Sequence, residues 1–197
     1  CRKLISIYFS LYTRNDENSF GVKDMKEMFY NCKSLNQIHI NVNNRSSYYN
    51  INMSRLFYNC INLTNIGNNF SHFYVTDTRE MFYNCIKLES IEFSPYYLNS
   101  SINMSQMFYN CKNIKNIIFN NFYNVYYNES NYIYYPNDMS YIFYNCESLI
   151  SLTFKYFNTE NVKNMNYLFY NLKNLSSFEI NDSNFSNTYI KSMKGTF

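Results

Sequence analysis

A pentapeptide that recurs along the chain limits what this sequence can fold into. Met28-Phe29-Tyr30-Asn31-Cys32 returns four times with Phe, Tyr, Asn and Cys intact, and a fifth time with Leu172 in place of Cys. The copies contain Phe29, Phe57, Phe82, Phe108, Phe143 and Phe169, and a truncated copy reaches Phe197. The intervals between these Phe residues are 28, 25, 26, 35, 26 and 28 residues. A nearly fixed period in this range is typical of a stacked repeat architecture.

Each repeat changes its hydrophobic period partway through. Between Met25 and Cys32 the apolar residues fall at i, i+3, i+4 and i+7, which lines up one face of a helix. From Gln37 to Ile40 polar and apolar residues alternate, as in a strand. The sequence therefore predicts one short helix followed by one short strand in every repeat.

Polar columns mark the expected ends of these helices. The predicted N-caps are Asp24, Asn52, Asp77, Asn103, Asp138, Asn164 and Ser192. Glu27, Glu80 and Gln106 follow three residues later and fit a capping box. After the last aromatic residue come Asn31, Asn59, Asn84, Asn110, Asn145 and Asn171. Asn often replaces Gly in the left-handed conformation that ends helices, so we expect positive φ throughout this second column.

One repeat is too small to bury its apolar stripe alone, so neighbouring repeats must stack. The expected fold class is α/β: a leucine-rich-repeat-like solenoid in which the strands form a parallel sheet on the concave face and the helices cover the opposite face. Residues 1–197 form a single repeat domain of six full helix units and a truncated one. The second repeat is the weakest, because Asn68 stands where the last apolar residue of the strand is expected.

At this level of detail the repeat resembles the roughly 26-residue repeat of the BspA-like branch of the leucine-rich repeats. The resemblance rests on the Leu-x-x-Ile-x-Phe strands, the Met-x-x-Met-Phe-Tyr-Asn-Cys segments and the linker from Phe157 to Met165. Such repeats occur in mycoplasma lipoproteins, other bacterial surface proteins and some protist surface families. The resemblance implies a surface or secreted protein that takes part in adhesion.

Both ends of the sequence fall inside a repeat, so we expect a fragment of a longer array. A mature bacterial lipoprotein also begins with Cys, and Cys1 could carry a lipid. A strand pattern starts immediately after Cys1, however, whereas lipid anchors are usually followed by a flexible tether. The fragment is therefore the favoured interpretation.

Motifs for chemistry are missing from the sequence. The six Cys residues occupy one repeat position and form no Cys-x-x-Cys pair, so a buried apolar role is favoured over a metal site, and disulfides between neighbouring coils stay open as an alternative. His39 and His72 have no Ser, Cys or carboxylate placed for catalysis, and are expected to be solvated. With three Gly, the chain has little material for a phosphate-binding loop. We predict no catalytic residue, no metal and no cofactor.

Net charge and hydropathy exclude further classes of partner. The net charge of +3 is spread along the chain, which disfavours nucleic acid and anionic membranes. No run approaches the roughly 18 apolar residues that span a bilayer.

The Tyr column that follows the Phe column could resemble a stacking platform for bases or sugars, but a ladder of like rings also stabilises a solenoid, and we favour that structural role.

Two surfaces are candidates for recognition. The first is the outward row of the strands, with the predicted binding residues Gln37, His39, Ser90, Glu92, Asn116, Ile118, Ser151 and Thr153; the same row includes Ser6, Tyr8, Asn65, Gly67, Ser177 and Glu179. The second is the long fifth linker from Asn120 to Asn137, with the predicted binding residues Tyr126, Tyr127, Tyr132 and Tyr134. A protein partner, such as a host extracellular protein, is the first hypothesis. A spacer without a ligand and a glycan-binding module are the alternatives.

Overall fold

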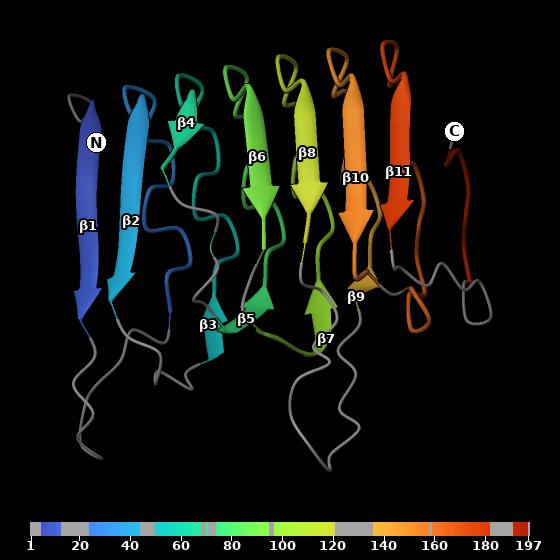
Figure 1. The fold of residues 1–197 in the computed structure, drawn as a ribbon, viewed down its shortest axis with the longest axis horizontal. Coiled ribbons are helices and arrows are strands. Elements are labelled where there is room, and N and C mark those ends of the chain that lie inside the picture. Colours follow the sequence, from blue (N-terminus) through green and yellow to red (C-terminus); the bar gives the residue numbers. More distant parts are fainter. Residues whose placement is uncertain are drawn as a thin grey trace.

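The computed structural model describes residues 5–12, 24–43, 50–67, 70, 74–94, 97–120, 136–157, 159–181 and 191–196. Its coils stack in sequence order, so that equivalent strands lie side by side (Figure 1). One three-stranded parallel sheet contains β1 (Ser6–Tyr12), β2 (Gln37–Asn43) and β4 (Asn65–Ile66). A four-stranded parallel sheet contains β6 (Ser90–Phe93), β8 (Asn116–Phe119), β10 (Ser151–Lys155) and β11 (Ser177–Asn181). We call the outward side of these two sheets the strand face.

The expected single sheet is divided between β4 and β6. β4 pairs with β2 at only two positions, Asn65 with Gln37 and Ile66 with Ile38. This is the repeat that lacks the last apolar residue of its strand, and Asn68 itself lies outside the described residues. A strand that cannot bury its second inward side chain gains little from extending, so the weakest repeat carries the shortest strand of the strand face.

A second parallel ladder lies where the sequence predicts only variable linkers. It consists of β3 (Asn50–Asn52), β5 (Tyr74–Asp77), β7 (Tyr97–Asn103) and β9 (Pro136–Asp138), in that spatial order. Isolated parallel bridges join Asp24 to Asn52, Asp138 to Asn164 and Asn164 to Ser192. The ends of the linkers are therefore aligned from coil to coil, although their lengths differ.

The predicted helices are wrong: the described residues contain no helix. The segment from Met25 to Leu35 is instead a run of tight turns, in which the amides of Met28, Tyr30 and Cys32 donate to carbonyls three residues earlier. The amide of Phe29 donates to the carbonyl of Leu56 in the next coil, at 3.0 Å, rather than four residues back. The same pattern recurs in the later coils, and together these segments form what we call the turn layer.

Coil spacing explains why turns replace helices. Parallel strands lie about 4.8 Å apart, whereas packed helices need about 8–10 Å between their axes. In the turn layer, stacked Tyr rings of successive coils lie 4.6 to 4.9 Å apart, which is the strand spacing. One helix per coil would not fit at that spacing unless the array curved strongly.

The predicted N-cap column has a different role. Oδ1 of Asp24, Asn52, Asp77, Asn103 and Asp138 accepts a 2.8 Å bond from the amide two residues later. This is an Asx turn, in which the side chain starts a turn rather than a helix. The capping-box prediction also fails, because Glu27, Glu80 and Gln106 adopt φ of 58°, 56° and 57°.

Positive φ in the Asn column is confirmed. Asn31, Asn59, Asn84, Asn110, Asn145 and Asn171 have φ between 57° and 63°. Their side chains also bond to one another: Asn84 donates to Asn59 at 2.6 Å, and Asn110 donates to Asn84 at 2.7 Å. A side-chain ladder that Gly could not provide therefore accompanies the left-handed conformation.

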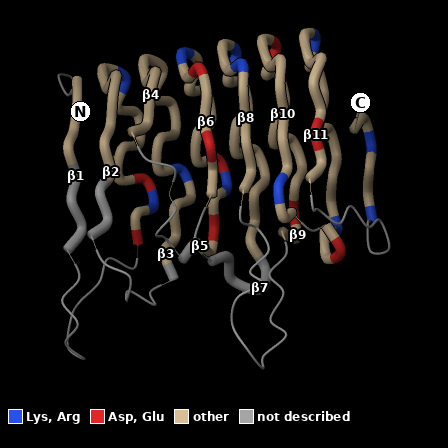
Figure 2. The backbone as a smooth tube through the Cα atoms, viewed as in Figure 1, with Lys and Arg blue, Asp and Glu red and all other residues tan. Residues whose placement is uncertain are grey.

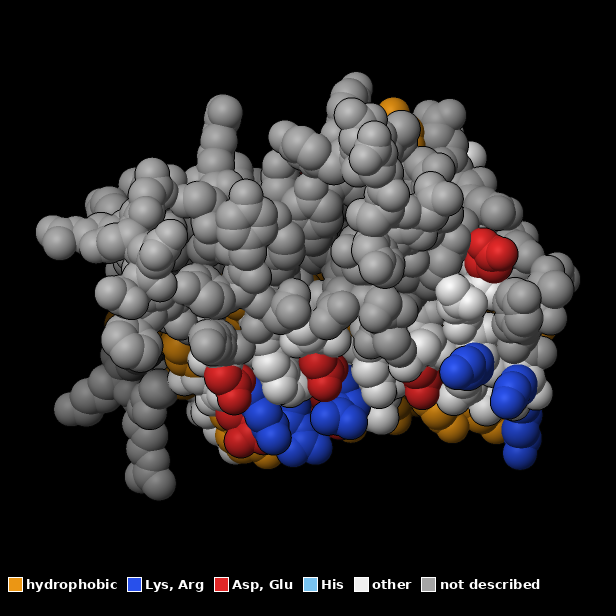
Figure 3. All heavy atoms as spheres, turned by 90° about the horizontal axis from the view of Figure 1, so that it is seen from below, with side chains coloured by type: hydrophobic (Ala, Val, Ile, Leu, Met, Phe, Trp, Pro, Cys, Tyr) orange, Lys and Arg blue, Asp and Glu red, His pale blue; other side chains and the backbone are white. Residues whose placement is uncertain are grey.

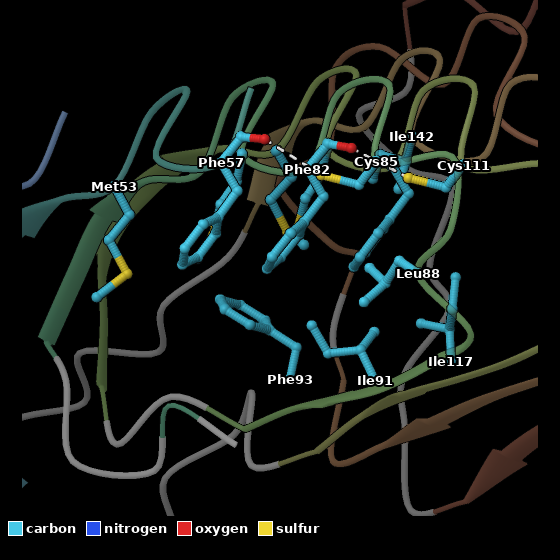
Figure 4. Packing of buried hydrophobic residues seen from close by; sticks show 14 of the residues in the cluster. Met53, Phe57, Phe82, Cys85, Leu88, Ile91, Phe93, Cys111, Ile117 and Ile142 are labelled. Atoms are coloured by element: carbon cyan, nitrogen blue, oxygen red, sulfur yellow. Dashed lines mark hydrogen bonds between the residues drawn. The ribbon is translucent and has the colours of Figure 1, made fainter. Parts of the chain in front are cut away.

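The core runs the length of the array as columns of like side chains. Phe57, Phe82, Phe108 and Phe143 are fully buried, and their rings stack between 5.2 and 6.2 Å apart. Figure 4 shows Phe57 and Phe82 side by side above Phe93, Ile91 and Leu88. Strands β2, β6, β8 and β10 contribute their inward apolar residues to the same continuous core.

Four cysteines form one of these columns and are free thiols. Sγ of Cys60, Cys85, Cys111 and Cys146 lies 3.0 to 3.2 Å from the carbonyl of the Phe residue in the preceding coil, two of these bonds being drawn in Figure 4. Burial raises the pKa of Cys60 to about 12 and raises the pKa values of the other three thiols well above the ordinary value. The expected inert, buried role holds for these four. Cys32 differs, because it is disulfide-bonded.

Candidate functional site

The strand face presents two rows of side chains in parallel register. The first row is short and polar throughout: Ser6, Gln37, Asn65, Ser90, Asn116, Ser151 and Ser177. The second row, two residues along each strand, is varied: Tyr8, His39, Gly67, Glu92, Ile118, Thr153 and Glu179. The backbone beneath both rows is held by the parallel pairing of the strands. The face is therefore a fixed frame with one nearly constant row and one variable row.

Most of the predicted binding residues on this face are accessible. Gln37, Ser90, Glu92 and Asn116 are exposed, and His39, Ile118 and Ser151 are half-buried. Thr153 is the exception, with a side chain that is only 6% exposed. It offers little surface to a partner, so we leave it out of the candidate site.

An aromatic pair distinguishes one end of the variable row. The rings of Tyr8 and His39 stack with centroids 4.8 Å apart and planes 6° apart, and Tyr8 is 80% exposed. Gly67 makes room for the pair, since a Cβ there would lie within 1.9 Å of His39 Nδ1. His39, which was expected to be solvated, is half-buried and has one ring face covered by Tyr8. The sequence pattern identified Tyr8 as outward but gave no sign that His39 would stack on it.

The Tyr-rich insert lies outside the described residues. This applies to Tyr126, Tyr127, Tyr132 and Tyr134, which stay predictions from the sequence. His72 also lies outside them. The candidate site that can be built from contacts is therefore the strand face.

The turn layer carries charged side chains that are paired with one another. Arg55 donates from Nε to Glu80 at 2.8 Å and from a terminal nitrogen to Glu27 at 3.3 Å. The bond to Glu80, followed by the attraction of both carboxylates, holds the pKa of Arg55 above its usual range despite partial burial. Figure 3 shows acidic and basic side chains side by side on the coloured part of the underside. These pairs join three successive coils, which favours a structural role.

The Tyr column of the turn layer is a continuous stack. Neighbouring rings from Tyr30 to Tyr170 are nearly parallel, with interplanar angles from 3° to 13°. Burial raises the pKa of Tyr58, Tyr83 and Tyr109 above the usual value. Each inner ring has a neighbour on both faces, so no gap between rings is left for a base or a sugar.

Among the described residues, no group of three or more His, Cys, Asp or Glu side chains lies close enough to hold a metal ion. Within the same residues, no helix has the length and apolar character that crossing a bilayer requires.

Comparisons with known proteins agree with this geometry. No curated protein matches the chain. Among solved structures, the crystal structure of a leucine-rich repeat protein of T. pallidum, TpLRR, superposes with a TM-score of 0.56 at 20% identity and covers 91% of this chain and 74% of that chain. This likeness shows a leucine-rich-repeat-like fold. A family model described as "Mycoplasma protein of unknown function, DUF285" matches residues 14–122 and 134–197. The match covers most of the sequence, and the chain therefore belongs to the DUF285 family of mycoplasma proteins.

Proposed function

We propose that this chain is a non-enzymatic recognition module of a surface or secreted protein and that it binds a protein partner through the strand face. Leucine-rich-repeat solenoids typically mediate protein binding and are typically non-catalytic. The observation that carries the proposal is the pair of rows that runs across the strands, one polar and uncharged throughout, the other varied. Surface localisation rests on the resemblance to surface-protein repeats.

The side-chain types of the strand face fit an interface. Interface centres are depleted in Lys and Glu, and the first row contains neither. Its Ser and Asn side chains lose less conformational entropy on ordering than long charged side chains would. Acidic residues on the face are confined to the second row, at Glu92 on β6 and Glu179 on β11 (Figure 2). The second row can supply specificity because its members differ in size, charge and hydrogen-bonding capacity.

Binding to a panel of extracellular proteins tests this proposal. The wild-type chain and Asn116→Arg would be immobilised in parallel with Asn113→Arg. Asn113 is an exposed Asn in the same coil, three residues earlier and outside the strand, so it is a matched control. We expect a panel member to bind the wild type and Asn113→Arg, and to bind Asn116→Arg at least about tenfold more weakly, because a long charged side chain would stand in the interface.

Two results would count against the strand face as the site. Equal binding by both variants would move the site elsewhere, with the fifth linker as the next candidate. No binding to any panel member by the folded wild-type chain would favour a spacer without a ligand of its own.

Glycan binding is a second candidate, supported by the Tyr8–His39 stack. Aromatic rings beside amide and hydroxyl groups suit sugar recognition, and Gln37 and Ser6 occupy the adjacent row. A glycan array with the wild type and Tyr8→Ala separates the two functions. Glycan signals that vanish in Tyr8→Ala would favour this candidate, and an array without signals would exclude it for the glycans displayed.

A further inference from the structure

One edge of the array is a row of turns that leads from the turn layer into the strands. Each of these turns has four residues, and Figure 1 shows them in line above the starts of the strands. We call this edge the rim. In the described part of the chain it consists of residues 33–36, 61–64, 86–89, 112–115, 147–150 and 173–176.

Hydrogen bonds fix the rim from coil to coil. The amide of Lys115 donates to the carbonyl of Glu89, and the amide of Ile150 donates to the carbonyl of Lys115, both at 2.8 Å. Side-chain amides add to this network, since Nδ2 of Asn62 donates to the carbonyl of Lys33 at 2.7 Å. The side chains of the rim therefore extend from a rigid backbone that advances by about 4.8 Å per coil.

The rim gathers basic side chains that are far apart in the sequence. It carries five Lys and two Glu residues, so its net charge is +3, which equals the formal net charge of the whole chain. By contrast, the two rows of the strand face contain Glu92 and Glu179 and no Lys or Arg. Spread along the sequence, these charges gave no sign of an anionic partner, but the stacking of the coils brings them to one edge. The Lys residues of the rim are Lys33, Lys87, Lys112, Lys115 and Lys173 (Figure 2).

Four of these five Lys side chains are available to an external anion. All five are exposed. Lys173 donates to Glu147 at 2.8 Å, and this bond, followed by the attraction of the same charge, lowers the pKa of Glu147. Within the described residues, the other four form no ion pair. Lys87, Lys112 and Lys115 lie in inner coils with a neighbouring coil on each side, so the basic edge does not depend on the two ends of the array.

Exposed Ile side chains accompany the Lys residues on the rim. Ile150 is 45% exposed, and Ile61 and Ile86 are half-buried. A hydrated polyanion gains little from contact with Ile. A bilayer, however, attracts a basic surface through its anionic headgroups and admits apolar side chains at the boundary between headgroups and acyl chains. The combination of Lys and Ile therefore favours a membrane surface over a soluble polyanion.

We propose that the rim docks onto the surface of an anionic lipid bilayer. The Lys side chains contact headgroup phosphates, and Ile150 reaches the boundary between headgroups and acyl chains. The array then stands edge-on, and the strand face remains accessible from the side. This contact is peripheral and separate from the recognition proposed for the strand face, so either proposal can fail without the other.

Sedimentation of the whole chain with lipid vesicles tests the proposal. Vesicles of equal parts phosphatidylglycerol and phosphatidylcholine should bind the wild type, and vesicles of phosphatidylcholine alone should bind it at least about tenfold more weakly. A Lys near an anionic membrane strengthens binding about fivefold, so the double variant Lys112→Gln/Lys115→Gln should bind the mixed vesicles about 25-fold more weakly.

The matched control is the double variant Lys163→Gln/Lys191→Gln. These two Lys residues are also exposed and lie in neighbouring coils, where the amide of Lys191 donates to the carbonyl of Lys163 at 2.9 Å. They lie among the linker ends, at the opposite edge of the array. The control therefore changes the net charge equally and should bind within about twofold of the wild type.

Two further measurements separate a membrane from other partners. Ile150→Ser should weaken binding to the mixed vesicles about threefold, and its unchanged binding would contradict the apolar part of the contact. Immobilised heparin serves as the soluble polyanion. A folded wild type that binds heparin but not the mixed vesicles would overturn the proposal and assign the rim to a polyanion. No binding to either probe, or an equal loss in both double variants, would also overturn it, with circular dichroism verifying the fold of each variant.

Discussion

At the residue scale, one Asn in each coil combines two tasks. Its backbone occupies the left-handed region. Its side chain bonds to the equivalent Asn of a neighbouring coil in the pairs Asn31–Asn59, Asn59–Asn84, Asn84–Asn110 and Asn145–Asn171. Gly would provide the first and lose the second, whereas most other residues would be strained. The positive φ could be predicted from the sequence because Asn is the usual non-Gly residue in this conformation. The side-chain ladder could not, since it depends on how coils align in space.

Asn84 allows the two contributions to be separated. Asn84→Gly should lower the free energy of unfolding by about 1 kcal/mol through loss of the ladder bonds, and Asn84→Ala by about 2–3 kcal/mol, since Ala is also strained at positive φ. Urea denaturation measures both. If the Ala variant proves as stable as the Gly variant, strain at this position is not significant.

The free thiols of Cys60, Cys85, Cys111 and Cys146 should be unreactive in the native state. Burial raises their pKa values, so few thiolates exist at about pH 8.5, where an exposed thiol is half ionised. Iodoacetamide labelling followed by peptide mass analysis should modify these residues only after denaturation. Rapid labelling of any of them in the folded chain would show that the column is accessible.

The same pKa values give a pH dependence of stability. Native thiols retain protons that the unfolded chain releases, so their contribution to stability is full below about pH 8.5. This contribution decreases as the pH rises toward about 12, which is the pKa of Cys60 in the native state. Urea denaturation at increasing pH should show this decline, and a variant with Cys60, Cys85, Cys111 and Cys146 replaced by Val should show a smaller one. Equal declines would assign the effect to other groups.

At the element scale, the turn layer shows where sequence reasoning fails. Inward residues at i, i+3, i+4 and i+7 are typical of a helix, but consecutive turns also place Met25, Phe29 and Cys32 in the core. Two features argue against the helix: positive φ at both Glu27 and Asn31, and stacking of neighbouring coils at strand spacing. The strands already implied the close stacking of neighbouring coils. Turn segments that are joined to parallel strands about 4.8 Å apart must lie at a similar distance from the turns of the next coil. Hydrophobic periodicity therefore located three of the four predicted inward residues, whereas Met28 is 39% exposed, and it assigned the wrong backbone.

Tyr83 tests how much the stacked turns contribute. Its ring lies 4.6 Å from Tyr58 and 4.7 Å from Tyr109. Tyr83→Ala should lower the free energy of unfolding by about 2–4 kcal/mol through loss of two ring contacts and of buried area. Tyr83→Phe keeps the stack and should remain within about 0.5 kcal/mol of the wild type. A small effect of the Ala variant would mean that the column contributes little to stability.

At the scale of the whole molecule, the two faces have separate roles. The turn layer joins coils through ring stacks and amide ladders that repeat with little variation, and through the ion pairs of Arg55. The strand face repeats its backbone and first row, but varies its second row from Tyr8 to Glu179. The stacked parallel architecture and the outward strand residues could be read from the period and the alternation. The division of the sheet, the second ladder and the Tyr8–His39 pair depend on contacts between coils, which one sequence does not specify.

An arginine scan of the first row tests the central claim that the strand face is the recognition surface. Gln37→Arg, Ser90→Arg, Asn116→Arg and Ser177→Arg would be compared, for binding to a partner found in the panel, with the adjacent controls Asn113→Arg and Ser176→Arg. We predict that a contiguous subset of the row variants binds at least about tenfold more weakly, while both controls bind normally and all variants stay folded. Unchanged binding by every folded row variant would contradict it.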